Sequence, residues 1–83
     1  MYDGKGQSVV GPFEASGGVR FALKHSGKSN FIVQVYGADG DRERSLANEI
    51  GDFDGSEVAR LRGTFYLTIE ADGPWRIEAA ASG

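Results

Sequence analysis

The residues of this 83-residue sequence that could do chemistry are a single histidine and several aspartates in two glycine-containing segments. The segment GDFDGSE at positions 51–57 carries Asp52 and Asp54, and the segment GADGD at 37–41 carries Asp39 and Asp41. Carboxylate oxygens are among the ligands that calcium takes in proteins. The first question is therefore whether these segments form metal-binding loops or polar turns between strands.

Neither segment has the spacing of an EF-hand loop. Such a loop needs oxygen ligands at positions 1, 3 and 5, glycine at position 6 and glutamate at position 12. Counted from Asp52, positions 6 and 12 are Glu57 and Gly63. Counted from Asp39, the first three ligands fit, but positions 6 and 12 hold arginine and isoleucine. The sequence excludes an EF-hand.

Two interpretations of the aspartates stay open. Two acidic turns at the same end of a fold would form a looser calcium site, with four ligands: Asp39, Asp41, Asp52 and Asp54. Alternatively, these are turns whose aspartates bond their own backbone, as aspartate commonly does in turns. The second interpretation is the simpler one, with Phe53 packed back onto the core, and we expect no bound cofactor.

His25 invites a catalytic interpretation, but we expect it to lack partners. Ser26 and Ser29 are close in sequence, yet neither lies on a G-x-S-x-G nucleophile elbow, and the chain has no cysteine. His25 instead continues an alternating apolar run and is predicted to be a structural histidine. A small filled core also leaves little volume for a pocket of the usual several hundred Å³. The sequence predicts a protein that is not an enzyme.

Exposed aromatic side chains are the remaining candidates for binding. By alternation Tyr36 and Tyr66 face outward and Phe53 lies in a loop, whereas Trp75 continues into Ile77 and is expected in the core. The alternatives are a carbohydrate-binding surface, tyrosines without a ligand, and a face that contacts another protein. One sequence leaves open whether the two tyrosines are neighbours.

The elements that must position these residues are predicted to be strands. Apolar residues recur at every second position, the period of a strand with one buried face, most clearly over 19–24, 31–36, 64–71 and 75–79. Weaker strands are expected over 8–15, 42–48 and 57–61, so the count is about seven. A short helix capped by Ser45 is the less favoured alternative over 45–50. Pro12 predicts a sheet edge or a bulge, because proline has no amide hydrogen to donate.

The resulting fold class is all-β, a two-sheet antiparallel β-sandwich of jelly-roll type. Most of the 13 glycines fall between the predicted strands and indicate turns. A spacing of 46 residues separates Gly17 from Gly63 and Gly27 from Gly73, which suits two similar hairpins in two packed sheets. Duplication is not required, since any two strands share the period of two.

Length and charge limit the remaining function classes. We expect one domain over residues 1–83, part of a larger protein. The net charge of −3 argues against binding to nucleic-acid phosphates, which needs an excess of Lys and Arg on one face. No run approaches the roughly 18 apolar residues of a transmembrane helix. Without cysteine there is no disulfide or thiolate zinc site.

Six segments spread over nearly the whole chain form a recognisable pattern: GPF (11–13), GGVRF (17–21), HSGKSNFIV (25–33), NEIG (48–51), GTFYL (63–67) and ADGPW (71–75). This pattern resembles a group of small bacterial β-sandwich domains that are appended to other modules and have no assigned activity. It is also loosely similar to the jelly-roll domains that follow the catalytic unit of some secreted bacterial peptidases.

This resemblance implies a fold and a bacterial source and favours an extracytoplasmic location over an otherwise open one, and it carries no catalytic residue. There are two functional hypotheses. The preferred one is a non-catalytic accessory or protein-interaction module that contacts another protein or other domains of its parent chain through sheet edges or turns. The alternative is a ligand-binding module for carbohydrate, through Tyr36 and Tyr66, or for calcium, through the acidic turns.

Overall fold

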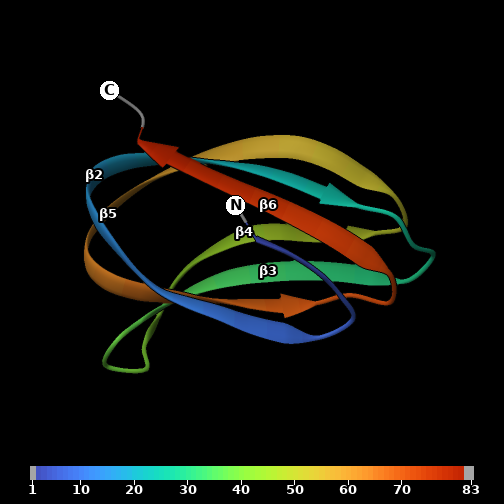
Figure 1. The fold of residues 1–83 in the computed structure, drawn as a ribbon, viewed down its shortest axis with the longest axis horizontal. Helices are drawn as coiled ribbons and strands as arrows, with labels where there is room; N and C mark the ends of the chain where they lie inside the picture. Colours follow the sequence, from blue (N-terminus) through green and yellow to red (C-terminus); the bar gives the residue numbers. More distant parts are fainter. Residues whose placement is uncertain (1, 82–83) are drawn as a thin grey trace.

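The computed structural model describes residues 2–81, which form a single open antiparallel sheet of six strands (Figure 1). The order across the sheet is β1-β6-β2-β5-β3-β4. The all-β prediction is confirmed. The strands are β1 (Tyr2–Lys5), β2 (Ser8–His25), β3 (Asn30–Gly37), β4 (Arg42–Ile50), β5 (Phe53–Glu70) and β6 (Pro74–Ala81).

The strand count differs from the prediction because two glycine segments bend strands instead of ending them. Gly17, with φ of 147°, lies inside β2, and Gly63, with φ of 114°, lies inside β5. Each pair of predicted strands on either side of these glycines is one continuous strand. The added strand β1 was not predicted. The strands form one sheet, and neither a separate second sheet nor a jelly-roll connectivity is confirmed.

The two long strands β2 and β5 lie at the centre of the sheet. They pair along their whole length, from Ser8 opposite Ile69 to His25 opposite Phe53. The second half of β2 also pairs with β6, whereas the second half of β5 pairs with β3. Figure 1 shows that the sheet folds back on itself where β2 and β5 bend, so that its two halves lie over each other.

One hydrophobic core fills the space between these halves, and the predicted alternation supplies it. Its largest fully buried apolar side chains come from β2, β3, β5 and β6, and they are Phe21, Leu23, Phe31, Val33, Val35, Leu67 and Ile77. Trp75 is 3% exposed, as predicted for a core residue. Residues at the alternate positions of the same strands face outward.

The predictions for residues 42–48 and for Pro12 are also confirmed. Residues 42–50 form a strand, not a helix. The register between β3 and β4 shifts after Val33, and the neighbouring residues Leu46 and Ala47 are both buried. Pro12 lies in the register shift between Val10 and Phe13, the bulge that its missing amide hydrogen favours.

Within residues 2–81 no helix is long and apolar enough to cross a membrane.

Candidate functional site

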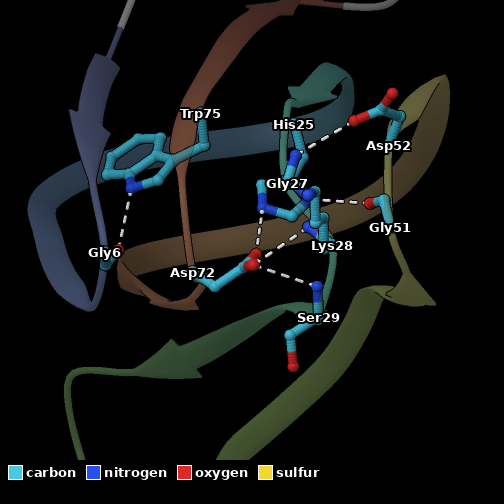
Figure 2. Close-up of polar contacts among 9 residues, drawn as sticks. All are labelled: Gly6, His25, Gly27, Lys28, Ser29, Gly51, Asp52, Asp72 and Trp75. Atoms are coloured by element: carbon cyan, nitrogen blue, oxygen red, sulfur yellow. Dashed lines mark hydrogen bonds and ion pairs between the residues drawn. The ribbon is translucent and has the colours of Figure 1, made fainter.

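Turns that are far apart in sequence meet at one end of the sheet, around His25 (Figure 2). The β2–β3 turn contributes Gly27, Lys28 and Ser29, the β4–β5 turn contributes Gly51 and Asp52, and the β5–β6 turn contributes Asp72. We call these residues, together with His25, the His25 cluster. They hold three turns to one another through side chains and backbone.

His25 is the centre of the cluster. It is only 2% exposed, and its ring stacks on Phe31 with centroids 4.7 Å apart and planes 6° apart. Nδ1 lies 2.8 Å from the carbonyl oxygen of Gly51 and donates to it, because a carbonyl only accepts. Nε2 lies 3.1 Å from Asp72 Oδ1. It makes no hydrogen bond of good geometry within residues 2–81.

Asp72 ties His25 to the next turn. Its Oδ2 accepts hydrogen bonds from the backbone amides of Lys28 at 2.9 Å and Ser29 at 3.0 Å. The Lys28 amide, then the Ser29 amide and to a lesser extent His25 hold the pKa of Asp72 below its ordinary value, while desolvation acts in the opposite direction. The carboxylate is therefore the form that fits the cluster.

Glycine is required where the β2–β3 turn passes His25. A Cβ on Gly27 would contact Asp72 Oδ1 and the His25 ring, whose nearest atoms would be 2.6 Å away. The Gly27 amide donates to Asp52 Oδ1 at 3.0 Å. The Gly51 amide donates to the carbonyl of Ser29 at 2.9 Å, which joins the same two turns a second time.

A second attachment lies beside the cluster and holds the first strand. The indole Nε1 of Trp75 donates to the carbonyl of Gly6 at 3.0 Å (Figure 2). The Trp75 ring also covers Gly4, where a Cβ would lie only 2.8 Å from the ring. The β1–β2 turn is thereby fixed to β6.

The cluster is built for holding turns together. Both ring nitrogens of His25 face oxygen atoms of neighbouring turns, and the ring is buried, so His25 joins the β4–β5 and β5–β6 turns to the end of β2. The expectation that His25 lacks an acid partner is wrong, since Asp72 fills that role. Sequence reasoning missed Asp72 because 47 residues separate it from His25. The only signal was its place in the turn ADGP.

The structure does not bring the four predicted calcium ligands together. Asp39 and Asp41 lie in the turn before β4, and Asp52 and Asp54 follow it, so the two pairs lie at opposite ends of a nine-residue strand. Such a strand is about 30 Å long. Asp39 Oδ1 accepts from the amide of Asp41 at 3.1 Å, the backbone bond expected of a turn. In the described residues no group of three or more His, Asp or Glu could hold a metal ion.

The two outward tyrosines, by contrast, are brought together. Tyr36 on β3 lies directly opposite Tyr66 on β5, and both side chains are half-buried. The Tyr36 hydroxyl donates to Gln34 Oε1 at 3.0 Å. Gln34 lies opposite Thr68, and beyond this pair is an open hollow of about 500 Å³ that Val9, Ile32 and Glu70 also line. We call this surface the tyrosine face.

Phe53 does not belong to the tyrosine face. It begins β5 and is not in a loop, which corrects the prediction, and it is half-buried against the core. Its ring lies 5.9 Å from that of Phe31, near the His25 cluster. Phe53 therefore packs back onto the core, as the simpler interpretation of GDFDGSE has it.

Comparison of the chain with protein-family models, with curated proteins and with solved structures finds no match.

Proposed function

We propose that this chain is a non-catalytic accessory module of a larger bacterial protein, a folded sheet of sandwich or jelly-roll type that binds carbohydrate through its tyrosine face. The observation that carries the proposal is the direct opposition of Tyr36 and Tyr66 across two neighbouring strands. This register places both side chains on the same outward face of neighbouring strands.

The surroundings of the two rings suit a neutral saccharide. Aromatic rings present apolar faces to the C–H groups of a sugar, and amide and hydroxyl groups beside them bond its hydroxyls. Gln34 and Thr68 form the next outward-facing pair along β3 and β5, and both also line the hollow beyond them. The backbone of both strands is fixed in the sheet, so binding orders few groups and the entropic cost is low.

Calorimetric titration with soluble polysaccharides tests this proposal. We expect at least one neutral glycan, from a panel of mixed-linkage glucan, xylan and mannan, to bind the wild-type chain. Tyr36→Ala and Tyr66→Ala should each weaken that binding at least tenfold, while Val58→Ala, an exposed residue of the other half of the sheet, should not. A panel without any binding, or tyrosine variants that bind like the wild type, would refute the carbohydrate proposal.

A second candidate function, protein interaction, is favoured by the free edge of β4. This nine-residue strand pairs only with β3 in the described residues, whereas the opposite edge strand, β1, has only four residues. An exposed edge accepts an extended segment of a partner by strand addition. Ile50 at its end is 77% exposed and would supply an apolar contact.

Self-association is the most direct test of this edge, because a second copy carries a matching strand. Sedimentation of the wild-type chain over a range of concentrations would detect a β4-to-β4 dimer. Asn48→Pro should reduce dimer formation by removing a ladder amide at the edge. A wild type that stays monomeric throughout would argue against a second copy as the partner strand.

A further inference from the structure

A different hollow lies where β2 and β5 bend, away from both the His25 cluster and the tyrosine face. Its volume is about 630 Å³, and it is open to solvent. Arg60, Arg62 and Glu14 line it with charge, and Phe13, Val19 and Ala79 line it with apolar surface. The backbone of Gly17 and Gly18 also lines it. We call it the bend hollow.

Small residues leave the two arginines uncovered. In the register of β2 and β5, Arg60 lies opposite Gly18 and Arg62 lies opposite Ser16. Residues two apart on a strand share a face, so both guanidinium groups arise from the same side of β5. A Cβ on Gly17 would meet no atom within 4 Å, which shows how open this stretch of β2 is.

In the described part of the chain neither arginine has a carboxylate oxygen within 4.0 Å. Within residues 2–81 the ion pairs closer than 4.0 Å are His25 with Asp72 and Arg44 with Glu57. Glu14 lines the same hollow without forming such a pair. Two exposed guanidinium groups therefore share one hollow in a chain whose net charge is −3.

The apolar wall of the hollow is fixed in place. The Phe13 ring packs edge-on against Phe21, with centroids 6.1 Å apart, and lies 6.0 Å from the ring of Phe65. Phe13 is nevertheless only half-buried, so part of its surface faces the hollow. Val19 and Ala79 extend this wall onto the second half of β2 and onto β6.

We propose that the bend hollow binds an organic anion, a carboxylate carried on a short apolar body. One guanidinium group can donate two parallel hydrogen bonds to a carboxylate, and Arg60 and Arg62 each carry such a group. The wall around Phe13 takes the apolar body out of water. This site is separate from the tyrosine face in position and in ligand class, so neither proposal depends on the other.

Backbone amide spectra of the ¹⁵N-labelled chain, titrated with three small probes, test the proposal. Octanoate carries both the charge and the apolar body, octanol lacks the charge, and acetate lacks the apolar body. We expect saturable shifts of the Gly17, Gly18 and Phe13 amides with octanoate, and at least tenfold weaker binding of the other two probes. Equal binding of octanol and octanoate, or no saturable shift near the bend, would overturn the proposal.

Charge variants test whether octanoate affinity falls when positive charge is removed and rises when negative charge is removed. Arg60→Gln combined with Arg62→Gln should weaken octanoate binding at least tenfold, and Glu14→Gln should strengthen it. The matched control is Arg76→Gln, an exposed arginine of β6 that does not line the hollow. All these side chains are exposed, and well-dispersed spectra would verify that each variant folds. Octanoate affinity that is unchanged in the double variant, or reduced equally by Arg76→Gln, contradicts the assignment.

Discussion

Tyr36 and Tyr66 lie directly opposite each other on β3 and β5, although 30 residues separate them in sequence. Cross-strand neighbours on one face have Cβ atoms about 5 Å apart. Sequence alternation placed both on the outer face, but only the register makes them neighbours. This pairing turns two separate residues into a candidate binding face.

The inward and outward aromatic positions should respond differently to truncation. Phe21→Ala and Phe31→Ala remove fully buried rings and should each lower the free energy of unfolding by about 3 to 5 kcal/mol, because a cavity remains. Tyr36→Ala and Tyr66→Ala should cost clearly less, because both side chains are half-buried. Urea denaturation of the four variants measures the difference. Equal losses at all four positions would contradict the assignment of faces.

The stability of the domain should depend on pH through Asp72. Its pKa is lowered in the folded state, so its stabilising contribution is fully present above the pKa of the unfolded chain and is lost as pH falls through the lower, folded value. Asp72→Asn should therefore lower the unfolding midpoint at pH 7, and the difference from wild type should shrink as the solution is acidified below the ordinary aspartate pKa of about 3.9.

Thermal melts of wild type and Asp72→Asn from neutral to acidic pH measure this difference. Asp54→Asn, a change at an exposed aspartate of β5, is the matched control and should follow the wild-type curve more closely. A difference between Asp72→Asn and wild type that stays constant across the whole pH range would show that the Asp72 charge does not stabilise the fold.

Gly27→Ala should be disruptive although the change adds one methyl group. The new Cβ would contact the Asp72 carboxylate and the His25 ring, and both are held by other bonds of the cluster. We expect a lower melting temperature and faster amide exchange at Lys28 and Ser29, whose amides lose their acceptor. Ser26→Ala, at the exposed neighbouring position, should leave both measurements almost unchanged.

The sequence predicted the faces of the strands better than it predicted their ends. The alternation of Phe21 and Leu23, or Phe31 and Val33, marks a buried face because the period of a strand is two. The sequence predicts turns at Gly17 and Gly63, but both glycines bend a continuous strand, because positive φ suits a bend inside a strand as well as a turn between strands. Local composition does not distinguish the two.

Contacts set by register could not be predicted from the sequence. The pairing of His25 with Asp72 depends on three turns meeting at one end of the sheet, and the opposition of Tyr36 and Tyr66 depends on the alignment of β3 with β5. The acidic turns show the same limit, because the direction of β4 places Asp39 and Asp52 at opposite ends. The types of these residues can be seen in the sequence, but which of them become neighbours depends on the topology of the sheet.

His25→Phe separates the two contributions of His25 to the fold. Phenylalanine can keep the stack on Phe31, but it cannot donate to the Gly51 carbonyl or contact the Asp72 carboxylate. Losing this part-buried hydrogen bond costs about 0.5 to 1.5 kcal/mol, so we expect a folded but less stable domain. Exchange of the Gly51 and Lys28 amides should accelerate more than exchange within the middle of β3. Wild-type stability in this variant would show that apolar stacking, not the polar contacts of the ring, explains why a histidine is buried here.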